Sequence, residues 1–282
     1  MRKIDPCVDI GRILCYNGCK AFEFLRSPMG DGMEKNMQIT FLGTADGIPR
    51  PGHFRTSTMI EENGAIYLID VGAPVTDLLF QLGKRYEDIR AIFNTHAHGD
   101  HLGGLLPLIE LCQWAYTDAE FDMYMPEQGV ADGFISCLQS MCTEPVATDR
   151  MRMRVFSEGV VFEDENIKVS AIATRHCEPR PSYAFLVESK SGLRVLFTGD
   201  LAVYNGDFPK VAYELETNLI VCEMAHFGAE EIAPCLEKCK TKQVIFNHYQ
   251  LRKERDIRAL AQSGKFSFPI HAAEDMDVIE VY

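Results

Sequence analysis

Residues 94–104 read NTHAHGDHLGG and place three histidines and one aspartate in a short segment, although the whole chain has only eight histidines. His96 and His98 are two positions apart, so both imidazoles point to the same side of an extended segment. Asp100 and His101 follow at the turn into a predicted helix. Four ligand-type residues this close together are costly to place in a fold without a partner ion. The segment therefore predicts a metal site.

Three more ligand-type residues follow predicted apolar strands in the second half of the chain. The strands VSAIATRH, LRVLFTGD and KQVIFNH end at His176, Asp200 and His248. Strand ends pass from a rigid scaffold into loops, and α/β architectures commonly collect site residues along that rim. We expect these endings to converge on one cleft with the histidine-rich segment.

The candidate ligands number seven, too many for one zinc ion. They are His96, His98, Asp100, His101, His176, Asp200 and His248. A zinc site with an open position takes three protein ligands, so seven divide into two sites that share one carboxylate. The set predicts a binuclear centre with two divalent ions. Zinc is the first expectation, and manganese and iron stay open because imidazole and carboxylate suit all three.

The rest of the sequence predicts a single domain over residues 37–282. Met37 opens an apolar strand, and the expected elements after it are strands at 56–62, 65–72 and 89–96 and helices at 75–84 and 101–116. Residues 1–36 are then an N-terminal extension, or the product of a start codon assigned too early.

The run THAHGDH, with His, Asp and His after later strands, resembles the metallo-β-lactamase-fold hydrolases. The stretches DVGAP at 70–74 and HAAEDMDVIEV near the end are also similar to that family, so the resemblance covers nearly all of residues 37–282. It implies an α/β fold, an αββα sandwich with a di-metal site at one edge. By the same resemblance His96, His98 and His176 hold one metal, Asp100, His101 and His248 hold the other, and Asp200 bridges them.

Two further stretches resemble the ribonuclease Z and phosphodiesterase branch of this family. These are FLGTADGIP near the start of the domain and HCEPRPSYAF from His176. His226 resembles that branch's extra histidine, which implies a place near the leaving group; the alternative is a helix-capping or core histidine. Antibiotic hydrolysis and flavodiiron oxygen chemistry are disfavoured, because those members carry Cys where Asp200 stands and Glu where His98 stands.

The sequence departs from typical ribonuclease Z proteins in ways that disfavour tRNA as substrate. Only 200 − 176 = 24 positions separate His176 from Asp200, which leaves no room for the arm that grips tRNA. The net charge is −13, so a long phosphate backbone meets a repulsive average field. We therefore expect a small or compact phosphodiester substrate.

The expected mechanism is attack by a metal-bound hydroxide, because two close metals lower the pKa of a shared water toward neutrality. Asp100 is expected to orient that water and accept its proton, and His226 to assist the departing oxygen. A thioester or lactone hydrolase on the same centre and a non-catalytic metal-binding module are the alternatives. Cys177, beside His176, could tune or oxidatively switch the site; the alternative is a packed, inert thiol.

The composition and the N-terminus indicate a cytoplasmic protein. Asp5, Pro6 and Asp9 interrupt any apolar run at the start, and no stretch is long enough to span a bilayer. The ten cysteines are expected to be reduced, since a chain of this size needs no disulfide framework. Neither the residues nor the resemblance sets the oligomeric state, so a monomer and a homodimer both stay open.

Overall fold

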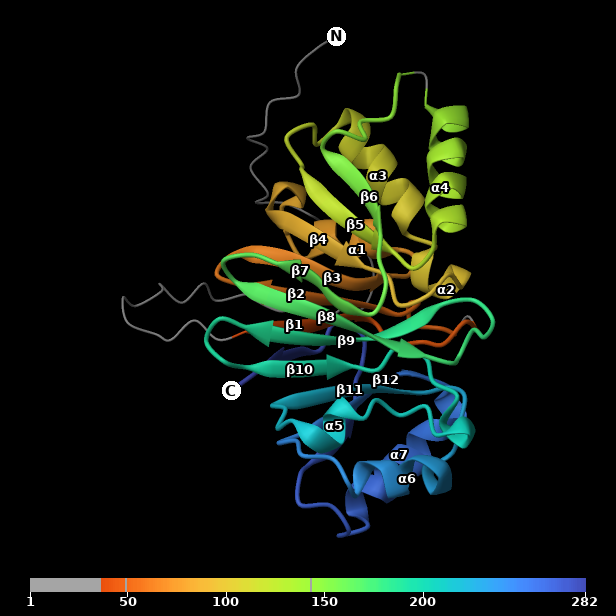
Figure 1. Ribbon diagram of the computed structural model, residues 1–282, viewed down its shortest axis with the longest axis vertical. Helices are drawn as coiled ribbons and strands as arrows, with labels where there is room; N and C mark the ends of the chain where they lie inside the picture. Colours follow the sequence, from red (N-terminus) through yellow and green to blue (C-terminus); the bar gives the residue numbers. More distant parts are fainter. Residues whose placement is uncertain (1–36, 49, 143) are drawn as a thin grey trace, which may run out of the picture. The chain divides into compact units, whose positions relative to one another are not determined.

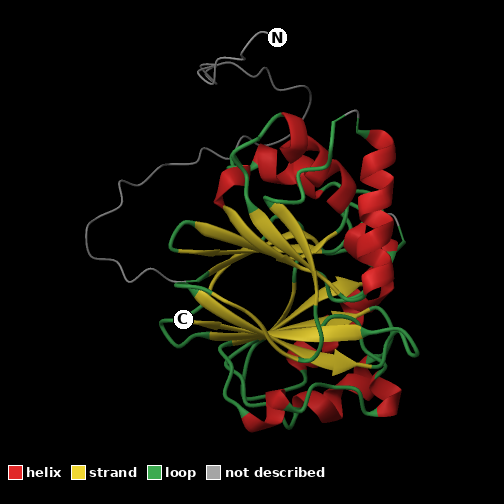
Figure 2. Ribbon diagram, turned by 45° about the horizontal axis from the view of Figure 1, so that its top comes forward, coloured by secondary structure: helices red, strands yellow, loops and turns green. Residues whose placement is uncertain are grey.

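The computed structural model describes residues 37–48, 50–142 and 144–282, so the expected extension 1–36 lies outside the described residues. Within the described part, two seven-stranded sheets face each other and helices cover their outer faces. Figure 2 shows these layers edge-on, with the strands of both sheets in the middle and helices on the outer sides. The predicted αββα sandwich is confirmed.

The first sheet has the order β14-β1-β2-β3-β4-β5-β6. Its strands are β1 (Gln38–Gly43), β2 (Ser57–Glu62), β3 (Ala65–Val71), β4 (Ile89–Phe93), β5 (Phe121–Met125), β6 (Met151–Val155) and β14 (Val278–Glu280). The strands from β3 to β6 pair in parallel, whereas β14, β1, β2 and β3 pair antiparallel.

The second sheet has the order β13-β12-β11-β10-β9-β8-β7. Its strands are β7 (Gly159–Glu163), β8 (Ile167–Thr174), β9 (Ser182–Ser189), β10 (Arg194–Phe197), β11 (Leu219–Met224), β12 (Val244–Tyr249) and β13 (Ile270–Ala272). The strands from β10 to β13 pair in parallel, and β7 to β10 pair antiparallel.

The helices divide between the two sheets. The first sheet packs against α1 (Val75–Gln81), α3 (Leu105–Trp114) and α4 (Gln128–Met141), with α2 (Gly99–Leu102) beside β3 and the short η1 (Tyr86–Asp88) before β4. The second sheet packs against α5 (Val211–Glu214), α6 (Ala229–Leu236) and α7 (Glu254–Gln262), with the short η2 (Val203–Asn205) and η3 (Leu251–Lys253) in the loops.

Strand β4 illustrates why the sequences of the central strands are continuous apolar runs. Ala91 and Phe93 face the core between the sheets, whereas Ile89 and Ile92 face the helices. Phe93 meets Phe185 of β9 across that core, with ring centroids 5.7 Å apart. A strand covered on both faces has no solvent side, so the hydrophobic pattern does not alternate.

One predicted element was wrong, because residues 101–116 form two helices instead of one. Helix α2 ends at Leu102 and α3 begins at Leu105, with Gly103 and Gly104 between them. The N–H of Gly104 donates to the carbonyl oxygen of Val71 at 2.7 Å, so the turn is fastened to the end of β3. A Cβ on Gly104 would lie 2.8 Å from that oxygen, so only glycine allows this approach.

Candidate metal centre

The histidine-rich loop is fixed where it leaves β4. Asn94 is fully buried, and its side-chain amide donates to the carbonyl of Tyr124 on the neighbouring β5 at 3.0 Å. The backbone N–H of Thr95 donates to Asp70 at the end of β3, at 2.8 Å. The loop thus starts from the carboxyl edge of three parallel strands, where α/β sheets commonly carry their sites.

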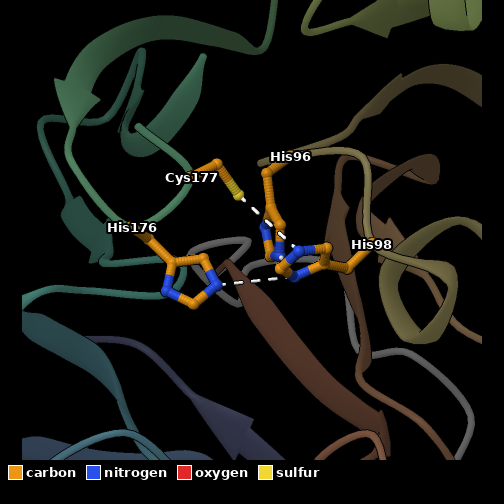
Figure 3. Close-up of side chains that lie close together, drawn as sticks. All are labelled: His96, His98, His176 and Cys177. Atoms are coloured by element: carbon orange, nitrogen blue, oxygen red, sulfur yellow. Dashed lines mark hydrogen bonds between the residues drawn. The ribbon is translucent and has the colours of Figure 1, made fainter. Parts of the chain in front are cut away.

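Three predicted ligands converge where the two sheets meet. His96 is fully buried and His98 is exposed, yet Nε2 of His96 lies 2.9 Å from Nδ1 of His98. Nε2 of His176, on the loop after β8 of the second sheet, lies 3.4 Å from the same Nδ1 atom. Figure 3 shows the three rings turned toward one another. The structure brings together histidines that are 80 residues apart in sequence order, as 176 − 96 = 80.

Asp200 lies at the centre of the cluster. It follows β10 and is buried. Its Oδ2 atom lies within 3.7 Å of one nitrogen on each of four histidines, and its Oδ1 atom lies 3.3 Å from a fifth. The four are His96 (3.7 Å), His101 (3.5 Å), His176 (3.5 Å) and His226 (3.7 Å), and the fifth is His248. This position suits a carboxylate shared between two cations.

A second group forms around Asp100. Its Oδ2 atom lies 3.2 Å from Nε2 of His248 and 3.8 Å from Nε2 of His101. Gly47, in the loop between β1 and β2, lies against the same carboxylate, since a Cβ there would come within 3.1 Å of Oδ2. All seven predicted ligands therefore meet at one edge of the sandwich.

Buried negative charge accumulates in this cluster. Burial raises the pKa of Asp200, but the charges of His248 and His101 outweigh burial and hold that pKa well below its ordinary value. Burial lowers the pKa of His101, but Asp200 and Asp70 outweigh it and the net pKa lies well above its ordinary value. The raised pKa of His101 reflects the need of buried carboxylates for positive charge beside them, a charge that a bound cation would supply in place of the proton.

Other ligands are held in the neutral form that a cation requires. Burial is the main cause that lowers the pKa of His96 far below its ordinary value and the pKa of His176 to about 4. A neutral imidazole keeps the lone pair with which it binds a metal. The electrostatics of His96 and His176 thus suit metal ligation.

Three buried polar atoms of the cluster form no hydrogen bond within the described residues, although each lies within ion-pair distance of another cluster atom. They are Nε2 of His101, Oδ1 of Asp200 and Nδ1 of His248. Buried polar atoms in native structures are nearly always satisfied, so these three need a partner of another kind. The candidate groups His96/His101/Asp200 and Asp100/His101/His248 each offer ligand atoms within 4.8 Å of one another. The residues present fit divalent cations.

Two residues of the site have left-handed backbones. Asp70 has φ +58° and His248 has φ +45°. Residues other than glycine rarely adopt these angles, although Asp and His tolerate them better than most. Such strain persists only where the surrounding structure enforces it, and it clusters at functional sites.

His226 lies at the rim, and neither structural alternative describes it. Its side chain is 39% exposed, so it is no core histidine, and Gly228 rather than His226 is the N-cap of α6. Its Nδ1 atom lies 3.0 Å from Oε1 of Glu223. Burial lowers the pKa of His226, but the hydrogen bond and charge of Glu223 outweigh it and raise the net pKa.

Cys177 is half-buried, and its Sγ atom lies 3.9 Å from Nε2 of His98. Burial is the main cause that raises the pKa of this thiol to about 11. The surrounding protein atoms thus hold Cys177 as an uncharged thiol. Every cysteine described is free, in line with the expected reduced thiols.

Sequence reasoning missed two acidic residues that hold the site histidines. Asp70 accepts a hydrogen bond from Nδ1 of His101 at 2.7 Å, and Glu223 faces Nδ1 of His226. Glu223 also accepts from the backbone N–H of Leu201 at 2.9 Å, which fixes the loop before β11. A signal existed for each: Asp70 comes near the end of the apolar strand AIYLIDV, and Glu223 is a lone charge in the buried strand LIVCEM.

Comparison with known proteins identifies the family. Residues 37–269 match the family described as "Anti-Pycsar protein Apyc1". The chain belongs to this family. This Apyc1-family chain is also similar to ribonuclease Z from Microcystis aeruginosa, with 31% identity over 158 residues, which are 55% of this chain and 49% of the relative. The chain thus spans about half the length of the curated relatives it matches.

Solved structures share the fold of this Apyc1-family chain. The short form of human tRNase Z has a TM-score of 0.68 and 23% identity, over 87% of this chain and 99% of that one. The metallo-β-lactamase fold protein YhfI from Bacillus subtilis has a TM-score of 0.67 and 17% identity, over 87% and 99% of the two chains. The predicted metallo-β-lactamase fold and the predicted likeness to the ribonuclease Z branch are confirmed.

The expected absence of a membrane span can be examined over the described residues. Within them, no helix has both the length and the apolar character needed to cross a bilayer.

Proposed function

We propose that this Apyc1-family chain is a binuclear metal-dependent hydrolase whose substrate is a compact phosphodiester. His96, His98 and His176 would hold one ion, Asp100, His101 and His248 would hold the other, and Asp200 would be shared between them. Zinc is the proposed ion. The observation that carries the proposal is the set of buried, unsatisfied ligand atoms of His101, Asp200 and His248, which point into a cluster of ionised carboxylates and neutral imidazoles.

When bound, two divalent cations supply Lewis acidity and a water that is acidic enough to act as nucleophile near neutral pH. Asp100 lies at the edge of the cluster, where its carboxylate orients the attacking water and accepts its proton. Burial raises the pKa of Asp100, but the hydrogen bond from His248 outweighs it and keeps this pKa far below its ordinary value. Asp100 therefore stays ionised before the reaction.

His226 supplies the proton that the leaving oxygen takes up. Glu223 holds its Nδ1 atom, so Nε2 is the nitrogen free to meet a departing oxygen. The water oxygen forms a new bond to phosphorus, the bond from phosphorus to the leaving oxygen breaks, and Nε2 protonates that oxygen. The raised pKa of His226 favours the protonated form that this role needs.

Two features support a compact substrate instead of a tRNA. Between His176 and Asp200 the chain forms β9 and β10 with a tight turn at residues 190–193, so this segment carries no protruding arm. The net charge of −13 disfavours a long polyanion. Ribonuclease Z relatives act on RNA as their name states, so a precursor tRNA belongs in the test.

The test combines a metal assay with hydrolysis of bis(p-nitrophenyl) phosphate by the full chain, with and without chelator. We expect about two ions per chain and turnover that the chelator abolishes. His98→Ala should lose metal and turnover together, whereas His271→Ala, at an exposed histidine outside the cluster, should keep both.

Further substrates decide between the alternatives. A cyclic mononucleotide, a precursor tRNA, a thioester and a lactone are compared under the same conditions. Faster turnover of precursor tRNA would contradict the compact substrate. Turnover of the thioester or lactone alone would show that the centre attacks carbonyl carbon, and bound metal with no turnover of any substrate would favour a non-catalytic module.

A further inference from the structure

The histidines of the loop after β4 are each held by the nitrogen that faces away from the cluster. Nδ1 of His96 lies 3.0 Å from the hydroxyl of Thr95, and Nδ1 of His101 lies 2.7 Å from Asp70. Metal-binding histidines almost always give their second ring nitrogen such a partner, which fixes the tautomer and the ring orientation.

The ring of His98 has the opposite orientation to the rings of His96 and His101. Its Nδ1 atom faces Nε2 of His96 and Nε2 of His176, so Nε2 is the outward nitrogen. Within the described residues, the one hydrogen-bond partner of this nitrogen is Sγ of Cys177 at 3.9 Å. Figure 3 shows the thiol of Cys177 and the imidazole of His176 approaching the two nitrogens of the His98 ring.

His98 needs such a partner more than its neighbours do. His96 and His101 are buried and packed, whereas His98 is exposed and is followed by Gly99. An exposed imidazole next to glycine keeps its rotamer freedom unless a contact removes it. The side chain that restricts His98 comes from the second sheet.

The loop that carries Cys177 is itself well held. The carbonyl oxygen of Cys177 accepts a hydrogen bond from the N–H of Arg180 at 2.7 Å, which closes a turn. The guanidinium of Arg180 pairs with Glu127, the residue before α4, at 2.9 Å for Nε. The thiol is therefore presented from a turn that is tied to the first sheet's side of the site.

We propose that Cys177 is a positioning residue for the first metal ion, which orients His98 through the outward ring nitrogen. If Nδ1 of His98 binds the cation, Nε2 keeps its hydrogen and would donate a hydrogen bond to Sγ of Cys177. This inference rests on the proposed metal centre. Sγ also lies within 4.8 Å of a ligand atom on each of His96, His98 and His176, so direct ligation is the alternative role that the experiment must separate from positioning.

The experiment measures zinc affinity by competition with a chromophoric chelator, using the full chain. Cys177→Ala should weaken one of the two ions about tenfold or more, with the other unchanged. Cys177→Ser, which keeps a smaller acceptor, should recover part of the loss. Cys137→Ala, at an exposed thiol on α4, is the matched control and should bind as the unmodified chain does.

Two further readouts separate positioning from other roles. The melting temperature of the metal-free protein should be the same with and without Cys177→Ala, and a clear drop would show a merely structural thiol. With cobalt in place of zinc, a sulfur-to-cobalt charge-transfer band lost in Cys177→Ala would show direct ligation and overturn the positioning role.

The result also separates this inference from the proposed function. If the unmodified chain binds two ions and Cys177→Ala binds them equally well, only the role of Cys177 is wrong. If the unmodified chain binds no metal, the proposed function fails and the role of Cys177 fails with it.

Discussion

Asp70 links the backbone of the histidine-rich loop to one of its ligands. It accepts hydrogen bonds from the N–H and hydroxyl of Thr95 and from Nδ1 of His101. A single carboxylate therefore sets both the path of the loop and the orientation of a ring within it. Asp70 is not among the proposed ligands, yet it would help to determine the geometry of the proposed metal site.

Asp70→Asn should lower the affinity of the His101 position for metal by about 10- to 100-fold, because the charge that raises ligand basicity is lost. Asparagine tolerates the left-handed backbone at this position, so the fold should survive. Competition titration with zinc measures the loss. Asp164→Asn, at a half-buried carboxylate in the turn before β8, is the control; an equal loss there would refute a specific role.

His226→Gln should keep both metal ions and lower kcat by about 10²- to 10⁴-fold, the usual contribution of a positioned proton donor. Metal content and steady-state kinetics on the same samples check this. His271→Gln, at an exposed histidine on β13, serves as the control. Full turnover in the His226 variant would remove this residue from the mechanism.

At this scale the sequence predicted much of the candidate site, and the reason is physical. Ligands such as His96 and His101 lie in one local run, so their spacing alone indicates their chemistry. Asp70 supports His101 from 101 − 70 = 31 positions away, and an aspartate near glycine also fits an ordinary turn. Side-chain partners distant in sequence are set by the fold, which a local pattern does not contain.

At the scale of elements, the break between α2 and α3 shows the same limit. The apolar residues of 101–116 have helical spacing, which correctly predicts a helical region. The interruption depends on Gly104 meeting Val71, and that contact exists only after β3 and the loop have come together. Strand positions were predictable because a buried strand needs a run of apolar residues in any context.

Gly104→Ala should destabilise the protein by about 1–3 kcal/mol, since the new methyl group would come within 2.6 Å of a Val75 side-chain carbon. Gly133→Ala is the matched substitution, because that glycine is exposed in α4 and nothing lies within 4 Å of its Cβ position. It should raise stability by about 1 kcal/mol through helix propensity. Denaturant unfolding measures both, and a stable Gly104 variant would contradict the assigned close contact.

At the scale of the whole molecule, the candidate centre joins the two sheets. His96, His98, Asp100 and His101 follow β4 in the first sheet, whereas His176, Asp200 and His248 belong to the second. Bound cations would therefore link the two halves of the sandwich, in addition to the apolar core between them.

Removing metal should lower the melting temperature by about 5–10 °C, since an ion present at about 100 times its Kd stabilises the fold by about 2.7 kcal/mol. Thermal unfolding with and without chelator measures the shift, and added zinc should restore it. Adding chelator to the Asp200→Asn variant should change its melting temperature little. A chelator shift of equal size in that variant would mean that the stabilising ions bind elsewhere.

The proposed domain boundary also belongs to this scale. Met37, the first described residue, is fully buried and its carbonyl accepts a hydrogen bond from the N–H of Val281, so it belongs to the packed domain. A chain that starts at Met37 should fold with the same melting temperature and keep its turnover. Gel filtration of both lengths tests whether residues 1–36 dock a partner; a smaller assembly for the shorter chain would show that they do.

The left-handed backbones of Asp70 and His248 have a consequence for protein engineering. Each strained backbone costs on the order of 1–3 kcal/mol, and glycine at the same position would remove most of this strain. A laboratory selection for heat resistance of the metal-free chain would therefore act against Asp70, which holds His101, and against His248, a proposed ligand, whereas a selection for metal binding would retain both. The two selections conflict at these positions, so a more heat-resistant variant of this protein is better sought by substitutions in its helices than at the candidate site.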